Sequence, residues 1–416
     1  MSGARVEFFQ KSGELRFSVE KKDIKSVNIN QSIDPASFEL PISTVELVVK
    51  AQTQPETGDK VLTYFDGVLQ SATVVKSCKL LKSGFYQIKT EDFISILNDT
   101  VFEGGVYSGE TLQNLLDLIT LKTGVTFESD NAGDFDDDLI RGYIPYSNCR
   151  VALQQMLFAN QLFAKTSGTD TIKICRVPWG NETSLTHERV FLNYNTDMVE
   201  PYDAVGIKHF MFYPSAEEVE VLFENKTGQS IDGLTVAFGE PCNDISISNG
   251  EILDGADITG STNKKVATNY VTINAGVGCV LYGKPYLKDE YLVSVKSGSI
   301  ASKTAKIESA TLLNLSNVSS VSSNSLYWLS RKTKISAEIV DRKRSIVGDY
   351  VRYGAKKYGA FVYGEKSKTE YIKDDSINVG DLVAVEFADG KTGLVQKQTY
   401  SLNGGILKKK SEIVLV

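Results

Sequence analysis

One short motif occurs twice in this chain, near its two ends, and it constrains the fold more than any other feature. Gly58-Asp59-Lys60-Val61 with Phe65-Asp66-Gly67 recurs as Gly380-Asp381-Leu382-Val383 with Phe387-Ala388-Asp389-Gly390. Lys76 and Gly84 then match Lys397 and Gly405 when one hairpin is shortened by two residues. Turn residues repeated between apolar runs predict one small β-barrel used twice. A chain that carries two copies of a ring-forming unit can match a partner of doubled symmetry.

The pattern of apolar residues predicts a mainly β fold. Residues 1–97 alternate between apolar and polar positions, and short turn signals separate the runs, which is typical of a barrel or sandwich of about six strands. We expect a mainly β fold with α+β insertions, in which two repeated β-barrels carry two smaller decorating domains. The expected domains are 1–97 (first barrel), 98–180 (small α+β), 181–230 with 330–416 (second barrel) and 231–329 (inserted, β-rich, ending in a helix).

Three segments show helical periodicity. Four apolar residues of the first fall at positions i, i+3, i+4 and i+7: Leu112, Leu115, Leu116 and Ile119. Ser108 is its expected N-cap and Gly124 its stop. A second helix is expected from a cap at Ser147 or Asn148 to Ala159, followed by a hairpin of residues 163–165 and 171–174. A third is expected over residues 317–332, despite six serines that weaken its propensity.

Composition narrows the class of protein. The 416 residues are 42% hydrophobic, which predicts about two to four globular domains. A formal net charge of −7 disfavours a nucleic-acid binder, because no basic field is available to release counterions from phosphates. The sequence starts without an apolar leader and has no run of about 18 apolar residues, so we expect synthesis in a cytoplasm and no stable membrane association. Five cysteines without CxxC spacing predict buried free thiols: Cys78, Cys149, Cys175, Cys242 and Cys279.

Motifs for catalysis or ligand binding are scarce. The only histidines are His187 and His209, too few for a multi-histidine centre, and His209 lies in an apolar strand where a structural role is expected. The acidic run 134–138 lacks the glycine and glutamate of a calcium loop and is interpreted as a solvated loop. Residues 278–284 fit a phosphate-loop pattern, but Pro285 replaces the Ser or Thr and a strand follows in place of a helix.

The lysine run near the end of the chain and the many acidic residues also indicate no catalytic site. The run Lys408-Lys409-Lys410 is interpreted as a solvated or edge-protecting face. The many acids give no carboxylate pair that the sequence alone singles out for hydrolysis. We therefore predict no catalytic residue, no metal ligand, no cofactor and no enzymatic activity.

Two stretches resemble the baseplate-hub proteins of long-tailed bacteriophages and related contractile particles, which are similar to the N-terminal hub part of siphophage tail-associated proteins. The first is Gly283-Lys284-Pro285-Tyr286 with its strands, followed by residues 310–318 and Tyr327-Trp328-Leu329. The second is the ending, with residues 377–383, 391–395 and 402–405. The likeness follows the domain order along the whole chain through turn and strand patterns.

The resemblance implies a virion protein of the tail tip or baseplate, made in the bacterial host cytoplasm. Two tube domains per chain would build a homotrimeric ring of pseudo-sixfold symmetry that caps the hexameric tail tube and forms part of the channel for DNA ejection. The expected partners are the tail tube or distal-tail ring, a central spike or fibre, and the tape-measure protein, with DNA only in transit. The repeated barrel turns would be structural: Gly58, Asp59, Asp66, Gly67, Gly84, Gly380, Asp381, Asp389, Gly390 and Gly405. No lysozyme, peptidase or long fibre follows Val416, so wall degradation would belong to another chain.

Two alternatives remain at this point. In the first alternative, the chain is a receptor- or carbohydrate-binding β module of the same tail tip. In the second, it is a cryptic hydrolase. Binding of glycans or cell surfaces by the isolated chain would favour the first alternative. Wall hydrolysis that one Asp or Glu substitution abolishes would favour the second.

Overall fold

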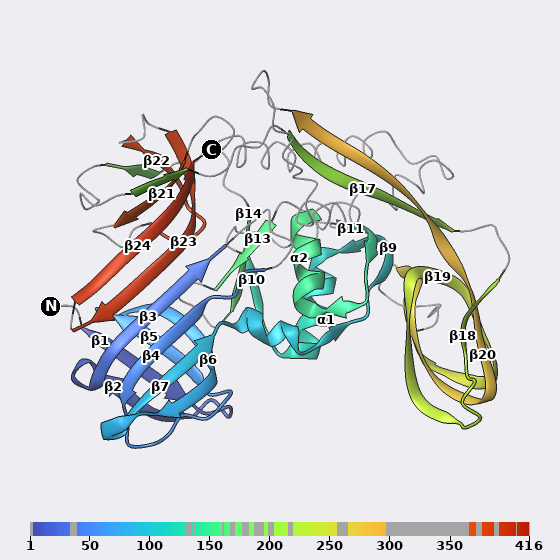
Figure 1. The fold of residues 1–416 in the computed structure, drawn as a ribbon, viewed down its shortest axis with the longest axis horizontal. Coiled ribbons are helices and arrows are strands. Elements are labelled where there is room, and N and C mark those ends of the chain that lie inside the picture. Colours follow the sequence, from blue (N-terminus) through green and yellow to red (C-terminus); the bar gives the residue numbers. More distant parts are fainter. Residues whose placement is uncertain are drawn as a thin grey trace.

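The computed structural model describes residues 3–33, 40–129, 135, 139–159, 162–166, 171–176, 183–186, 195–198, 204–214, 219–255, 265–296, 366–371, 377–386, 391–404 and 406–415. These residues form a mainly β structure with small helical parts, as the sequence predicts (Figure 1). Within these ranges, no helix is long and apolar enough to cross a membrane.

The first seven strands form a barrel-like sheet at the N-terminus. They are β1 (Ala4–Phe9), β2 (Leu15–Glu20), β3 (Ile24–Ser32), β4 (Thr44–Lys50), β5 (Lys60–Phe65), β6 (Val68–Leu80) and β7 (Phe85–Glu91), with η1 (Lys21–Asp23) and η2 (Lys82–Gly84) in two turns. Their order in the sheet is β3-β4-β7-β6-β5-β1-β2, and all neighbours are antiparallel. Alternate residues such as Phe8, Ile29 and Leu47 are buried in one core because successive side chains point to opposite faces.

A second sheet is built from strands of the middle and the C-terminus. They are β15 (Thr183–Leu185), β16 (Asn195–Met198), β21 (Lys366–Tyr371), β22 (Leu382–Val385), β23 (Lys391–Asn403) and β24 (Ile406–Leu415), in the order β16-β21-β24-β23-β22-β15. Six buried residues form its own core: Leu185, Ile377, Val383, Val385, Val395 and Ile413. In the part of the chain that the structure describes, this sheet and the first are continuous and contain thirteen strands.

Strand β23 joins the two sheets. Its first residues pair with β22, and residues 397–403 pair with β24 on one side and with β3 on the other. Tyr400 and Leu402 from this strand are 3% exposed and lie in the core of the first sheet. The two sheets therefore meet edge to edge, and Figure 1 shows β23 lying between β24 and β3.

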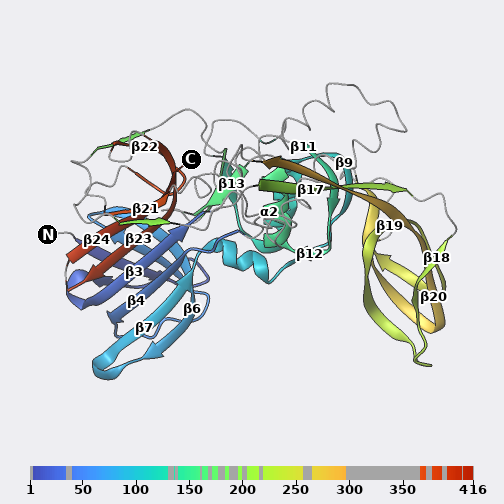
Figure 2. The same ribbon diagram turned by 45° about the horizontal axis from the view of Figure 1, so that its top comes forward.

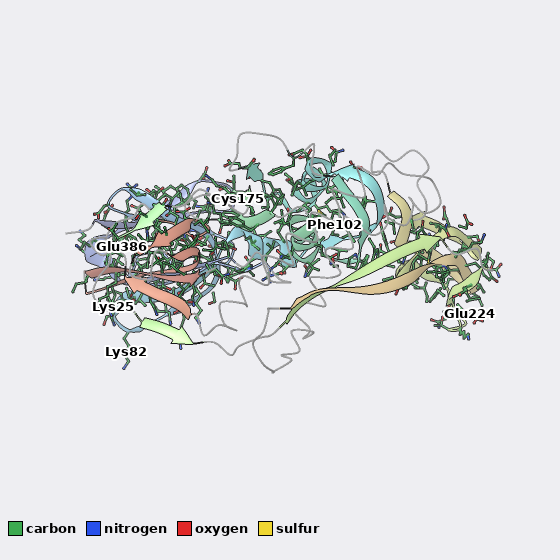
Figure 3. All side chains as sticks on the ribbon, turned by 90° about the horizontal axis from the view of Figure 1, so that it is seen from above. Lys25, Lys82, Phe102, Cys175, Glu224 and Glu386 are labelled. Atoms are coloured by element: carbon green, nitrogen blue, oxygen red, sulfur yellow. The ribbon has the colours of Figure 1, made fainter. Side chains whose placement is uncertain are left out.

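A small α+β part lies between the two sheets in sequence. Its elements are η3 (Phe93–Asn98), β8 (Val101–Phe102), β9 (Gly105–Thr111), α1 (Leu112–Thr123), β10 (Phe127–Ser129), β11 (Leu139–Ile144), β12 (Ser147–Asn148), α2 (Cys149–Ala159), β13 (Leu162–Lys165) and β14 (Ile172–Arg176). Its core also includes Ile33 and Leu40, which flank the connection from β3 to β4, and Val379 and Leu394 of the C-terminal part. Figure 3 labels two of its residues, Phe102 and Cys175.

The two predicted helices in this part are confirmed, with one correction. The N-cap of α1 is Thr111, whose Oγ1 accepts from Asn114 N at 3.2 Å, whereas Ser108 lies within β9. The helix ends at Gly124, which has a φ of +73° as expected for a left-handed cap. In α2, Asn148 Oδ1 accepts from Val151 N at 2.9 Å. The hairpin of β13 and β14 also forms as predicted.

The inserted part is a sheet of long strands that extends away from the helices (Figure 2). Strand β20 (Lys265–Lys296) pairs with β17 (Ala204–Pro214), β18 (Glu220–Glu224), β19 (Ile231–Asp254) and β9. Strands β17 and β18, whose residues fall in the range expected for the second barrel, thus pair with β20 of the inserted sheet. Residues 278–284 lie inside β20, so the phosphate-loop pattern has no helix behind it. The helix expected over 317–332 lies outside the described residues.

Candidate assembly site: two matching turns and one shared strand

The two copies of the Gly-Asp motif form the same hydrogen-bonded turn. In the first, Gly58 N donates to Val75 O, Val75 N donates to Asp59 O, and Asp59 Oδ2 accepts from Glu56 N at 2.9 Å. Gly58 has a φ of +91°, a conformation that favours glycine. The aspartate closes the turn with its carboxylate, which explains why Asp follows Gly.

The second copy repeats these bonds. Gly380 N donates to Val395 O, Val395 N donates to Asp381 O, and Asp381 Oδ2 accepts from Asn378 N at 2.8 Å. The φ of Gly380 is +94°. Each bond of the first turn therefore has a counterpart in the second.

The surroundings of the two turns differ. Asp59 is 1% exposed and forms an ion pair with Arg16, whose Nε lies 2.8 Å from Asp59 Oδ2 and whose Nη1 lies 2.9 Å from Glu56 Oε1. The hydrogen bond to Glu56 is the largest of the effects that raise the pKa of Arg16. At the second turn, a Cβ on Gly380 would lie 2.9 Å from two ring carbons of Phe163, because this turn packs on the α+β part. The first turn is thus held by charge and the second by packing.

The strands behind the turns also correspond. Asp59 bonds to Val75 and Asp381 to Val395, so the span is 16 residues in the first copy and 14 in the second. The hairpin is two residues shorter in the second copy, in agreement with the spacing in the sequence. The register then shifts after Val75 and after Val395, at one bulge in each copy. Lys397 therefore corresponds to Ser77, and its expected match with Lys76 is displaced by one residue.

Five strands of each copy have the same order and orientation. Strands β3, β4, β7, β6 and β5 correspond to β16, β21, β24, β23 and β22, and every neighbouring pair in both sets is antiparallel. The next position differs, because β1 is antiparallel to β5 whereas β15 is parallel to β22. The inserted sheet enters the second copy between β16 and β21, where the first copy has only the connection from β3 to β4.

The remaining turn residues are described in part. Asp66 and Gly67 have φ values of +49° and +80° and connect β5 to β6 as a two-residue hairpin turn. Gly84 has a φ of +72° in the turn after β6. Asp389, Gly390 and Gly405 lie outside the described residues.

The junction between the copies consists of β3 and the second half of β23. The pairs run from Lys397 opposite Ser32 to Asn403 opposite Ser26. On one face, Thr399 Oγ1 donates to Asn30 Oδ1 at 3.1 Å. On the other face, Tyr400 contacts the ring of Phe65 at a centroid distance of 6.3 Å. Alternate residues are buried in both strands, but no sequence signal specifies that β23 pairs with β3.

The interpretation of Lys408-Lys409-Lys410 as a solvated face is wrong for the middle residue. Lys409 is 6% exposed, and its Nζ donates to Ile377 O at 2.8 Å and lies 5.3 Å from the centroid of the Tyr400 ring. Gln398 Nε2 donates to the same carbonyl at 2.8 Å and to Ser411 Oγ at 3.0 Å. A short β-strand points alternate residues to opposite faces, so one of three consecutive lysines faces inward here.

A buried carboxylate that the sequence did not single out connects the first sheet to the α+β part. Asp92 caps η3 and accepts from Ser43 N at 2.8 Å, Ile94 N at 3.2 Å and Thr166 Oγ1 at 2.7 Å. Burial raises the pKa of this carboxyl to about 6, although the donors favour its charged form. All four residues are in contact inside the protein, so we interpret Asp92 as a structural link.

The side chains that could bind a metal ion are dispersed in the described ranges. No group of three or more His, Cys, Asp or Glu residues could hold a metal ion there. His209 lies in strand β17, as predicted, and His187 lies outside the described residues. All five cysteines are free, and four are buried, which confirms the prediction except at the half-buried Cys78. Of the acidic run 134–138, only Phe135 is described, and it is buried.

Comparisons with solved structures find bacteriophage tail proteins. The chain is similar to the 43 kDa tail protein of prophage MuSo2 from Shewanella oneidensis (8% identity, TM-score 0.47, covering 100% of this chain and 98% of that one). It is also similar to a tail protein from Neisseria meningitidis MC58 (11%, 0.47, 100% and 96%) and to prophage tail protein gp18 from Listeria monocytogenes EGD-e (10%, 0.45, 99% and 94%). No protein family and no curated relative matches the sequence. At these scores the likeness carries no functional assignment.

Proposed function

We propose that the chain is a structural hub of a bacteriophage or phage-like tail tip or baseplate. Three chains form a ring of six similar sheets that joins the hexameric tail tube to a central spike or fibre and surrounds part of the channel for DNA ejection. The observation that carries this proposal is the duplicated sheet: two five-stranded units of the same order, with the same Gly-Asp turns, are joined edge to edge within one chain.

The physical argument is one of symmetry. A contact between unlike edges of two similar units is head-to-tail, and repetition of such a contact generates a closed ring when the rotation fits. Two units per chain let three chains present six similar faces to a sixfold tube. The absence of a metal-binding cluster from the described residues is compatible with this role but does not carry it.

The partners follow from the same proposal. The tube or distal-tail ring would contact one rim of the six units, and a spike or fibre would contact the other. The tape-measure protein and the DNA would pass through the centre. In this arrangement the chain has no enzymatic activity of its own and resides in the virion.

The test measures the oligomeric state of the chain and its binding to the tube and spike proteins. Purified full-length chain is analysed by native mass spectrometry over a range of concentrations, alone and with the tube and spike proteins of the same particle. We expect a trimer, and incorporation into a complex with both partners. A chain that stays monomeric at high concentration and binds neither partner would refute the proposal.

A second experiment addresses the competing role as a receptor- or carbohydrate-binding module. Particles are labelled with antibody against the chain and imaged by electron microscopy. We expect label at the end of the tail tube, and we expect tails to be missing when the gene is deleted. Intact tails that assemble without the chain but no longer adsorb to cells would favour the receptor-binding role instead.

A further inference from the structure

The junction between the two sheets occurs once within the chain, but each of its strands has a counterpart elsewhere. Strand β23 of the second copy corresponds to β6 of the first, and β3 of the first copy corresponds to β16 of the second. Strands β6 and β16 do not pair with each other in the described chain. The chain therefore carries both halves of a second junction, on opposite copies.

The end of β6 offers an open edge in the described residues. Strand β5 pairs with β6 only as far as Val74, and β7 pairs along the other side as far as Leu80. Residues 77–80 are thus hydrogen-bonded to β7 alone, whereas the corresponding residues 397–400 of β23 have β24 on one side and β3 on the other. An exposed strand edge of this kind is a ready template for pairing with another chain.

Side-chain exposure at this edge agrees with a missing neighbour. Leu80 is 61% exposed, although it corresponds to Tyr400, which is 3% exposed because the junction covers it. Ser77 and Lys79 are exposed, and Cys78 is half-buried against the first core. Lys82, in the turn that follows, is also exposed and lies at the margin of the molecule (Figure 3).

Strand β16 supplies the complementary edge. It is the terminal strand of the thirteen-stranded sheet and pairs only with β21 in the part of the chain that the structure describes. Its counterpart β3 pairs with β4 on one side and with β23 on the other. Among the described strands, none pairs with the side of β16 that corresponds to the β23-binding side of β3.

We infer that β6 of one chain pairs antiparallel with β16 of a second copy of the same chain, in the register that β23 and β3 use within the chain. This inference rests on the proposed ring and specifies its chain-to-chain contact. Alternating junctions of β23 with β3 and of β6 with β16 would then join all units of the ring.

The register can be transferred residue by residue. Residue pairs can be followed from β7 through β4 to β3 in the first copy and from β24 through β21 to β16 in the second. By this comparison Asn30 corresponds to Asp197, and Gln31 corresponds to Met198. The bulge follows Val75 in β6 and Val395 in β23, so Lys79 corresponds to Thr399. Since Thr399 lies opposite Asn30 within the chain, Lys79 would lie opposite Asp197 of the second copy.

The residue types at the transferred positions are complementary. Lys79 with Asp197 places opposite charges at one pair, where the intrachain junction has a hydrogen-bonded Thr399 and Asn30. Opposite charges at directly facing positions stabilise an antiparallel pair, and like charges destabilise it. The neighbouring pair would be Cys78 with Met198, which are both compatible with a covered position. The register follows from backbone pairing alone, so the charge match is independent support for it.

The register is tested by disulfide trapping. Directly opposite residues of antiparallel strands have Cα atoms about 4.5–5.5 Å apart, within the range of a disulfide. The Met198→Cys variant of the full-length chain is oxidised with diamide, so that the new cysteine of one chain can form a disulfide with native Cys78 of a second chain. We expect covalent dimers and trimers on a non-reducing gel that disappear with dithiothreitol. Thr196→Cys is the matched control, because it lies two positions along the strand and faces Leu80 in the transferred register; Met198→Cys with Cys78→Ser is the second.

Charge reversal tests the contact without covalent trapping. Lys79→Glu and Asp197→Lys should each weaken the oligomer by about two- to thirtyfold in dissociation constant, and the double variant should recover it. The variants are also compared by circular dichroism and hydrogen exchange of β5, so that loss of folding is recognised.

The outcomes separate the two proposals. Disulfide formation by Met198→Cys but by neither control variant, together with recovery of the oligomer in the double charge reversal, supports the inferred contact. A trimer by native mass spectrometry that is neither trapped nor affected by charge reversal would overturn the contact while leaving the hub function standing. A chain that remains monomeric and binds neither the tube nor the spike protein would overturn both.

Discussion

The two Gly-Asp turns allow a comparison in which the same substitution is made in two copies of one structure. Asp59 and Asp381 each accept a backbone N–H from the residue three positions earlier, but only Asp59 is buried beside an arginine. An aspartate that closes a turn in this way stabilises it by about 1 kcal/mol. Asp381→Ala should therefore lower the local free energy of unfolding by about 1 kcal/mol.

Asp59→Ala should cost more, because it also removes a partner of Arg16. Loss of one member of a fully buried ion pair costs about 3–5 kcal/mol, but Arg16 keeps Glu56 and its side chain is 14% exposed, so we expect about 1–2 kcal/mol from this source. The total for Asp59→Ala is then about 2–3 kcal/mol. Asn at each position separates the two effects, because it keeps an acceptor oxygen and removes the charge.

Hydrogen exchange of the full-length chain measures these losses locally, which avoids assuming that a multidomain protein unfolds in one step. The readouts are the slowest amides of β5 and β6 for Asp59 and of β22 and β23 for Asp381. We expect Asp381→Asn to be close to neutral and Asp59→Asn to lose about 1–2 kcal/mol. Equal losses for the two alanine variants, or a neutral Asp59→Asn, would refute this account of the turns.

Three further predictions concern the links between the parts. Leu402→Ala, in the second copy, should destabilise the first sheet by about 2–5 kcal/mol, measured as faster exchange in β3 and β4, whereas Ser401→Ala should not. Gly380→Ala should cost more than Gly67→Ala in thermal unfolding, since both have positive φ but only the first meets a ring, that of Phe163; equal costs would contradict this packing. The pKa of Asp92 is about 6 in the native state, whereas the pKa of an aspartate in the unfolded chain is about 4. Asp92 therefore makes the free energy of unfolding fall by up to about 3 kcal/mol as the pH rises from about 4 to about 6. Asp92→Asn should remove this part of the pH dependence, measured by urea unfolding at a series of pH values.

The sequence predicted the local structure well where turn chemistry or periodicity specified it. Asp66-Gly67 has the composition of a two-residue hairpin turn, and the apolar spacing of Leu112 to Ile119 fits a helix face. The N-cap of α1 was misplaced because Ser108 and Thr111 are both good caps, and the pairing of Ser108 in β9 depends on the distant strand β11.

Contacts between distant segments could not be predicted in the same way. The pairing of β23 with β3 joins residues more than 360 positions apart, and period-two alternation specifies a buried face without naming the partner strand. The inward position of Lys409 could not be predicted for the same reason. Which of three adjacent lysines faces the core depends on how β24 pairs within the sheet. The salt link of Arg16 to Asp59 also depends on how β2 folds back over the first turn.

The most direct test of the hub proposal is the arrangement of the two sheets in the assembled protein. Electron cryomicroscopy of the purified oligomer, viewed along its symmetry axis, would show this arrangement. The account predicts a closed ring of three chains in which first and second sheets alternate as six similar lobes, with every lobe joined to the next by strand pairing. An oligomer in which the two sheets of one chain lie at different radii or heights, so that no six-lobed ring forms, would contradict it.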